Sequence, residues 1–409
     1  MKILVSTGEV SGDVIGARIA SEIFRRCPEA SIFGIGGPRM ETAGVVIDFG
    51  TNHLGTVGIT EPFFAVPAFA RALGRVRRRV RREPPDAALL IGNDVFNVLL
   101  GRWLKGRGIP TVSCFPPQVW IWRSLSRPIS KSYDLILTSF PEEQSVYERT
   151  GVPTRFVGHY LCETLAPVTA SERVKARQKY ALPTEGTVVG LMPGSRIQEV
   201  RRFASILLDA ADLLLQSDSS LRFILPVAEP LYEERIAREL KRRSFANRVV
   251  LAGGSSDAMR AADLILLASG TASLEAALLG IPMVIIYRVS AFTMWVVRTA
   301  IRLGLMDSET LGLPNLALGY VAVPEIRQEM LSAPAVASEA QSLLGSRPRA
   351  EKMRRALGEV RARIAGRDVI GSIAGAVLEV AARGAVSPEV ESERLGRSAA
   401  VSALRRREG

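Results

Sequence analysis

The chain of 409 residues has little cysteine, little histidine and no long apolar run. Its three cysteines lie far apart and do not form a disulfide framework, so we expect a reducing compartment. Two histidines and the lack of metal-ligand spacing argue against a metal site. No stretch reaches the roughly 18 consecutive apolar residues of a membrane span, and residues 1–6 predict a first strand and no secretory signal. These absences favour a cytoplasmic protein.

Acidic residues are outnumbered, with 41 Asp and Glu against 53 Lys and Arg, which gives a formal net charge of +12. Such an excess of positive charge favours one of three kinds of partner: nucleic acid, an anionic membrane surface or a phosphorylated substrate. The sequence has no helix-turn-helix, zinc-finger or RNA-binding signature, so we expect no nucleic acid partner.

Short apolar segments alternate with helix-length spacers along the whole chain, which predicts parallel sheets and an α/β fold. The length favours two domains. We expect two doubly wound, Rossmann-like halves that face a central cleft, with ligands at the carboxyl ends of the strands. The predicted domains are residues 1–165 and 166–384, with a charged tail at 385–409. The predicted strands are residues 3–6, 31–34, 87–91, 111–114, 135–138, 155–157, 187–191, 222–226, 248–252, 263–267 and 283–287.

The most informative motif follows the apolar run at residues 265–268, where a buried strand is predicted to end in a small-residue turn. A helix then starts near Thr271 and Ser273. The first turn of a helix presents unpaired N–H groups and a partial positive charge, which together bind anions. One turn further along, Glu275 is within reach of a sugar hydroxyl. The residues predicted to bind are Ser269, Gly270, Thr271, Ala272, Ser273 and Glu275.

A second segment repeats this design upstream. The strand predicted at 187–191 leads into a turn in which Gly194 and Ser195 are followed by Arg196. A guanidinium binds a phosphate through two parallel hydrogen bonds. Two such sites in one half of the chain predict that the protein binds a nucleotide diphosphate.

The first predicted strand leads into a glycine-rich loop that precedes an amphipathic helix. This loop either holds a polar substrate against the helix start or is an ordinary turn capped by Ser11 or Asp13. A second glycine-rich turn at residues 34–37 lacks the spacing and the acidic partner of a dinucleotide fingerprint. The loop residues with candidate roles are Gly8, Glu9, Ser11, Gly12 and Asp13.

Residues 63–82 combine an apolar stripe with many arginines. The stripe consists of Phe63, Val66, Phe69, Leu73, Val76 and Val80, and the arginines are Arg71, Arg75, Arg77, Arg78, Arg79, Arg81 and Arg82. Such a helix lies flat on an anionic bilayer, or it packs its stripe on the sheet and exposes its basic face to water. Residues 292–305, which include Trp295, allow the same two interpretations.

Two further segments follow predicted strand ends. Trp120 and Trp122, with Arg123 beside them, form either a cleft wall or a packed loop. His159 follows the strand at 155–157 and is either a site residue or a structural histidine.

Taken together, these segments resemble the lipid-A-disaccharide synthase family, whose members are inverting glycosyltransferases of the GT-B type. The resemblance runs from Lys2 to about Gln328. It rests on residues 8–13, 34–37, 57–61, 117–123, 156–159, 193–196, 269–275, 282–284, 287–288, 313–316 and 323–325, with Met40, Glu199 and Gln328.

The resemblance implies transfer of 2,3-diacylglucosamine from UDP to 2,3-diacylglucosamine 1-phosphate, without a metal or other cofactor. It implies a peripheral enzyme on the cytoplasmic face of the inner membrane, and it suggests a homodimer. It places Arg196 and residues 269–273 at the UDP diphosphate, Glu275 at the ribose, and Arg288, Asn315, Glu325 and Gln328 on the nucleotide side. Residues 8–13, Glu61, Asn97, Trp120, Trp122 and His159 are placed on the acceptor side.

The sequence departs from the family pattern before Asn97. An ungapped match puts Gly92 and Val95 where the family has two aspartates, the second of which is its candidate catalytic carboxylate. Asp94 is adjacent, although side chains next to each other at a strand end point in different directions unless a bulge intervenes. Tyr160 also replaces a proline of the family pattern, and about two residues are inserted before Leu313.

Inverting transfer needs a base for the acceptor hydroxyl and positive charge on the departing diphosphate. The candidates for the base are Asp94, Glu9, Asp13 and Glu61. We therefore expect a glycosyltransferase resembling this family. The alternatives are a paralogue with another sugar acceptor, and an inactive protein that binds a nucleotide sugar at the membrane. A sugar-nucleotide epimerase is disfavoured, because the basic amphipathic segment and the tryptophans suit a lipid substrate better.

Overall fold

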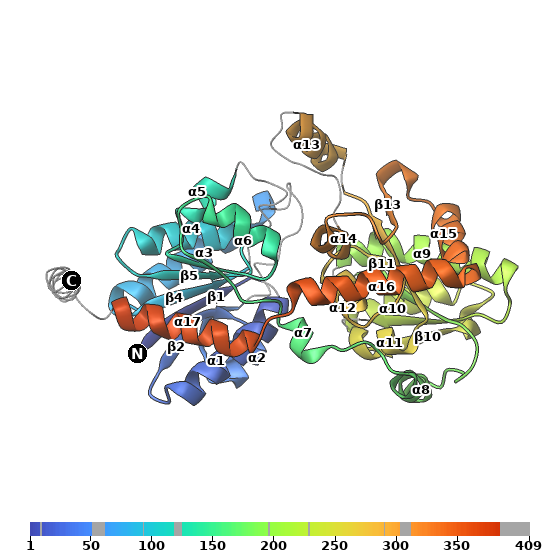
Figure 1. Cartoon of the computed structure of the whole chain (residues 1–409), viewed down its shortest axis with the longest axis horizontal. Helices are drawn as coiled ribbons and strands as arrows, with labels where there is room; N and C mark the ends of the chain where they lie inside the picture. Colours follow the sequence, from blue (N-terminus) through green and yellow to red (C-terminus); the bar gives the residue numbers. More distant parts are fainter. Residues whose placement is uncertain are drawn as a thin grey trace, which may run out of the picture. The chain divides into compact units, whose positions relative to one another are not determined.

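A computed structural model of the chain (Figure 1) describes residues 1–8, 10–50, 62–92, 94–117, 125–194, 197–227, 230–289, 291–302 and 312–384. The chain divides into two compact units. Unit 1 comprises residues 1–158, 300–307 and 366–409, and unit 2 comprises residues 159–299 and 308–365.

Unit 1 contains a parallel sheet whose seven described strands lie in the order β3-β2-β1-β4-β5-β6-β7. The strands are β1 (Lys2–Thr7), β2 (Ser31–Gly36), β3 (Val46–Gly50), β4 (Ala87–Ile91), β5 (Thr111–Cys114), β6 (Leu135–Thr138) and β7 (Thr154–Phe156). The strand order changes direction between the neighbours β1 and β4. In doubly wound sheets, ligands bind outside the carboxyl ends of the strands at this switch point. The six strands predicted for this half are confirmed, and the edge strand β3 is an addition.

The helices of unit 1 cover this sheet. They are α1 (Val10–Arg26), α2 (Pro38–Thr42), α3 (Pro62–Arg82), α4 (Asp94–Lys105), α5 (Ser126–Ser130), α6 (Pro141–Glu148) and α17 (Val369–Gly384). The last helix, α17, lies against α1, β4 and β5. It is also joined to β7 by an ion pair of 2.8 Å between Arg155 and Glu379. The sequence-based boundaries assign α17 to the second domain, whereas its apolar face is buried in unit 1.

Helix α3 packs its apolar stripe into the core of unit 1. Val76 and Val80 are buried, and Phe69 and Leu73 pack against the same core cluster. Three arginines lie over aromatic rings of neighbouring elements: Arg75 over Phe49, Arg77 over Trp103 and Arg79 over Phe33, with 5.2 to 5.5 Å between each guanidinium carbon and the ring centroid. The core-helix interpretation therefore holds for the described part of the stripe.

Unit 2 contains a second parallel sheet, whose six described strands lie in the order β10-β9-β8-β11-β12-β13. The strands are β8 (Val188–Met192), β9 (Arg222–Val227), β10 (Val249–Gly253), β11 (Leu264–Ala268), β12 (Met283–Tyr287) and β13 (Glu325–Arg327). The switch point lies between the neighbours β8 and β11. All five strands predicted for this half are confirmed, and β13 is an addition.

The helices of unit 2 include the two that follow β8 and β11. The unit contains α7 (Leu161–Thr164), α8 (Ala170–Lys179), α9 (Ile197–Ser217), α10 (Pro230–Leu240), α11 (Ser255–Ala261), α12 (Thr271–Leu278), α14 (Leu313–Leu318), α15 (Ala333–Gly345) and α16 (Arg347–Ile364), with short 3-10 turns η3 (Ala246–Arg248) and η4 (Gln328–Met330). Helix α13 (Ala291–Arg302) crosses the boundary, with residues 291–299 in unit 2 and residues 300–302 in unit 1. In the described part of the chain, no helix has both the length and the apolarity to cross a bilayer.

Candidate functional site: the carboxyl edge of the second sheet

The turn between β11 and α12 lies at the switch point of unit 2. Ser269 continues the sheet by donating its N–H to the Ile286 carbonyl at 3.0 Å. Helix α12 begins at Thr271, whose side chain is exposed. Ser273 is fully buried, and its hydroxyl donates to the Gly270 carbonyl at 2.7 Å. Ser273 therefore shapes the turn, while the start of α12 supplies the positive end of a helix dipole.

Glu275 lies in the second turn of α12 and is mostly buried. Burial raises the pKa of its carboxyl group above the usual value. A carboxyl group in such surroundings gains from a hydrogen bond to a ligand hydroxyl, because burial has removed its water. This environment suits the predicted contact with a ribose.

The turn after β8 approaches the first turn of α9 closely. Gly194 has a φ of 112°, and a Cβ atom there would lie 2.2 Å from Glu199 Oε2. Only glycine fits this conformation and this space. The predicted phosphate ligands Ser195 and Arg196 lie outside the described residues.

The end of β12 is joined to the end of β13 through Arg288. The Arg288 guanidinium donates to the Gln328 carbonyl, from Nε at 3.3 Å and from Nη2 at 3.1 Å. It also donates to the Leu331 carbonyl at 2.5 Å. These bonds occupy one edge of the guanidinium with backbone oxygens. The sequence did not indicate this use of Arg288.

Hydrogen bonds of Asn315 and Glu325 fix the loop before β13. Asn315 Oδ1 accepts from the N–H groups of Ala322 and Val323, each at 2.9 Å. Its Nδ2 donates to the Val323 carbonyl at 2.8 Å and to Glu325 Oε1 at 2.7 Å. Asn315 is buried and all its hydrogen-bonding capacity is used, so it orients Glu325.

In unit 1, the loop after β1 turns directly into α1. A Cβ atom on Gly12 would lie 1.8 Å from Thr7 Oγ1, so the helix starts tightly against the strand end. Asp13 is buried, and its carboxylate accepts from the N–H groups of Gly37, Arg39 and Met40 at 2.8 to 3.1 Å. Both oxygens thus stabilise the start of α2, and we do not propose Asp13 as the base.

Asn97 ties the two strands of the unit 1 switch point together. It is fully buried, and its Oδ1 accepts from the Ser6 hydroxyl at 2.7 Å. Its Nδ2 donates to the carbonyls of Ser6, Ile91 and Gly92 at 2.7 to 3.3 Å. These contacts give Asn97 a structural role beside the predicted acceptor site.

The candidate base Asp94 is the first residue of α4, directly past the carboxyl end of β4. Gly92 has a φ of 54°, and Val95 is 51% exposed. The remaining predicted acceptor-side and catalytic residues are outside the described part of the chain: Glu9, Glu61, Trp120 and Trp122.

His159 is the first residue of unit 2 and is buried. Burial lowers the pKa of its imidazole to about 3, so the ring is neutral. Its Nδ1 accepts from the backbone N–H of Leu161 at 3.3 Å, and the backbone N–H of His159 donates to the Ile364 carbonyl at 2.8 Å. His159 therefore shapes the start of α7. Within the described residues, no group of three His, Cys, Asp or Glu side chains could hold a metal ion.

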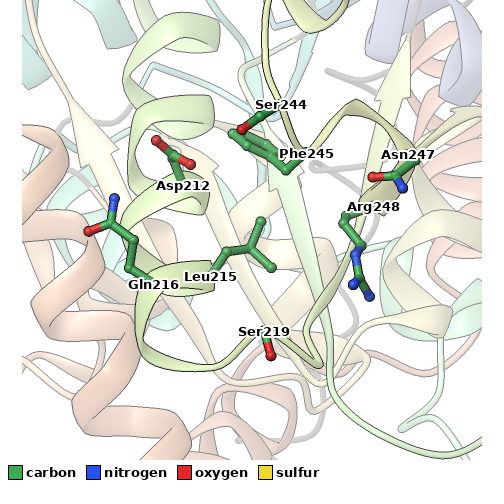
Figure 2. A pocket seen from close by; sticks show the side chains of 8 residues that line it. All are labelled: Asp212, Leu215, Gln216, Ser219, Ser244, Phe245, Asn247 and Arg248. Atoms are coloured by element: carbon green, nitrogen blue, oxygen red, sulfur yellow. The ribbon is translucent and has the colours of Figure 1, made fainter.

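Unit 2 also has a depression of about 380 Å³ (Figure 2). It lies at the amino edge of the sheet, opposite the carboxyl edge. It is lined by Asp212, Leu215, Gln216, Ser219, Ser244, Phe245, Asn247 and Arg248. The lining residues come from α9 and from the segments that precede β9 and β10. This depression is therefore separate from the carboxyl edge, where ligands of doubly wound sheets bind.

Known structures share this architecture. A UDP-GlcNAc 2-epimerase from Neisseria meningitidis, solved with UDP-GlcNAc, is 13% identical with a TM-score of 0.61, over 94% of this chain and 100% of that chain. A ugt transferase from Siraitia grosvenorii, solved with UDP, is 15% identical with a TM-score of 0.55, over 93% and 98%. The chain therefore has the GT-B fold with two Rossmann-like domains, as predicted.

The sequence comparisons identify the family. A family model described as lipid-A-disaccharide synthetase matches residues 3–366. A lipid-A-disaccharide synthase of Pseudomonas paraeruginosa is 38% identical over 84% of this chain and 89% of its own length. Another, from Geobacter sulfurreducens, is 36% identical over 93% and 97%. The chain belongs to the lipid-A-disaccharide synthase family and is a glycosyltransferase.

Proposed function

We propose that the chain transfers 2,3-diacylglucosamine from UDP to 2,3-diacylglucosamine 1-phosphate, giving the disaccharide 1-phosphate of lipid A and UDP. The main support is the switch point of unit 2 in a member of this family. There, two glycine turns lead from β8 and β11 into the starts of α9 and α12.

In this proposal, unit 2 binds the leaving group. The start of α12 and Arg196 stabilise the negative charge that develops on the UDP diphosphate as the sugar departs. Glu275 accepts a hydrogen bond from a ribose hydroxyl. Asp94 takes the proton from the acceptor hydroxyl, since its backbone lies just past β4 at the switch point of unit 1.

The reaction is tested by incubating the pure protein with UDP-diacylglucosamine and the acylated monosaccharide phosphate and following UDP release. R196A is expected to lower the rate of UDP release by about 100-fold, because it removes a group that stabilises the developing negative charge. R347A is the matched control, because the Arg347 side chain is 88% exposed. The proposal fails if UDP release by the wild-type chain does not exceed the rate without enzyme.

A second candidate is a protein that binds UDP-sugar but has lost the base for this acceptor. Val95 favours it, because this exposed residue stands where the family pattern has its candidate catalytic carboxylate. Two substitutions separate the candidates. D94A abolishes turnover if Asp94 is the base, whereas V95D creates or raises turnover if the base has been lost.

We also propose that the protein acts at an anionic membrane surface, on the cytoplasmic face of the inner membrane. In unit 1, α3 and α4 are neighbours, as the contacts Phe69–Phe96 and Arg77–Trp103 indicate. Their outer faces expose Leu99, which is 54% exposed, Val95, and four arginines spaced along one side of α3. Those arginines are Arg71, Arg75, Arg78 and Arg82. Exposed aliphatic side chains beside basic residues favour binding to anionic lipid headgroups.

Vesicle flotation tests this membrane surface. L99S is expected to reduce binding to vesicles that contain phosphatidylglycerol, and added salt should weaken binding further. V321S is the matched control, because Val321 is 69% exposed in unit 2. Equal binding to neutral and anionic vesicles would contradict the electrostatic part. A homodimer remains a prediction from the family resemblance, to be tested by sedimentation velocity.

A further inference from the structure

The backbone turn at the end of β13 is strained. Gln328 has a φ of 49°, in the left-handed region that residues other than glycine rarely occupy. Such a conformation persists only when its surroundings hold it in place, and it is often found at functional sites. The contacts around Gln328 therefore show what maintains the turn.

Arg288 supplies those contacts. Its guanidinium donates twice to the Gln328 carbonyl and once to the Leu331 carbonyl, so it spans η4 from one side to the other. The fork geometry of a guanidinium suits two carbonyl oxygens that diverge in this way. A lysine or a neutral side chain could not make all of these bonds.

Arg288 is in turn held by α9. Arg202 Nη1 donates to the Arg288 carbonyl at 2.6 Å. Helix α9 begins at Ile197, three residues after Gly194. One continuous set of hydrogen bonds thus connects α9, the end of β12 and η4.

The Gln328 side chain has a buried donor. Its Nε2 atom is inaccessible to water and has no hydrogen-bond partner within the described residues. A side-chain amide carries two N–H donors, and buried donors nearly always have partners. A ligand with acceptor oxygens at the carboxyl edge of the sheet would satisfy this donor.

We infer that Arg288 and Arg202 are positioning residues that hold the Gln328 turn, so that the Gln328 amide donates to an oxygen of the UDP-sugar. This inference rests on the proposed function. It differs from the sequence-based expectation for Arg288, which placed that guanidinium directly on the nucleotide. The two roles predict different energetic coupling between Arg288 and Gln328.

A double-mutant cycle distinguishes the two roles. UDP affinity is measured by calorimetry for R288A, Q328A and the double variant. Loss of one hydrogen bond near the upper end of the usual range of net strength weakens binding roughly 10-fold, so the UDP affinity of each single variant is expected to fall by about that factor. If Arg288 acts only through Gln328, the UDP affinity of the double variant also falls by about 10-fold. A fall of about 100-fold would show that Arg288 and Gln328 contact UDP independently, and it would overturn the inference.

Steady-state kinetics with the UDP-sugar provide a readout that simple misfolding would not reproduce. R288A is expected to raise KM while kcat changes little. Partial unfolding would instead lower the active fraction, and hence kcat, at constant KM. R347A serves again as the exposed arginine control.

R202A gives a second measurement that leaves both Arg288 and Gln328 in place. It is expected to weaken UDP binding about threefold in the wild-type background and not at all in the Q328A background. An equal effect in both backgrounds overturns the inference. If the wild-type chain has no affinity for UDP, the proposed function fails and this inference fails with it. If the wild type binds UDP and R288A binds equally well, only the inference fails.

Discussion

Replacing Asn97 by alanine should destabilise unit 1 without affecting the nucleotide site. The side chain makes four buried contacts, at 2.7 to 3.3 Å. Because Nδ2 has only two N–H groups for three carbonyls, we count three hydrogen bonds. At about 1 kcal/mol net for each bond, N97A lowers the free energy of unfolding by about 3 kcal/mol.

Calorimetry is the assay for this prediction. For a unit of this size, about 3 kcal/mol corresponds to a fall in Tm of roughly 6–12 °C in the transition of unit 1. UDP affinity should stay unchanged, because the predicted UDP ligands lie in unit 2. N247A is the control, since Asn247 is exposed. Asn97 would be an acceptor ligand and not a structural tie if N97A kept its Tm and raised only the KM for the acceptor.

N97D adds a pH test of the same contacts. The new carboxylate would face three backbone carbonyls, so the folded state would favour its protonated form and raise its pKa. Stability relative to the wild type is then highest below the ordinary Asp value of about 4 and falls as the pH rises. A variant whose stability relative to the wild type does not depend on pH would contradict this reasoning.

Three further predictions concern the remaining site residues. G194A should lower the free energy of unfolding by about 1–3 kcal/mol and weaken UDP binding, because the φ of 112° at Gly194 and the nearby Glu199 exclude a Cβ atom. Calorimetry checks the binding, with G253A as the control that should bind UDP like the wild type. The pKa of His159 is lowered to about 3, so the wild type should lose stability relative to H159N as the pH falls from about 6.5 toward 3, measured by urea unfolding. Burial raises the pKa of Glu275, so the stability of the wild type should fall relative to that of E275Q as the pH rises above about 4.3. A stability difference between the two proteins that does not change with pH in urea unfolding would refute this.

Most of the strands could be predicted because buried parallel strands are short, continuous apolar runs. Strand β11 contains only apolar residues, and all of them are buried. Strands β3 and β13 lie at sheet edges and were not predicted, although the edge strands β7 and β10 were. Each also contains charged or half-exposed positions, such as Asp48 and Arg327.

The site could be predicted only where local sequence determines local structure. Gly194 and the start of α12 belong to strand-turn-helix segments that are readable within a few residues. Arg288 bonds to carbonyls 40 and 43 positions away, and Asp13 bonds to N–H groups 24 to 27 positions away. Backbone groups carry no residue identity, so no sequence pattern indicates such partners. Arg202 was missed for the same reason.

The return of the last helix to the first unit affects how the protein assembles. Val369, Ile373 and Val377 of α17 are fully buried against elements made more than 250 residues earlier in the chain. During synthesis, β4 and β5 therefore lack the helix that packs on them until α17 has left the ribosome, whereas every segment of unit 2 has been synthesised by residue 365. The first half of this enzyme is thus the last to be completed, and a fragment that stops at residue 165 would expose an apolar surface prone to aggregation.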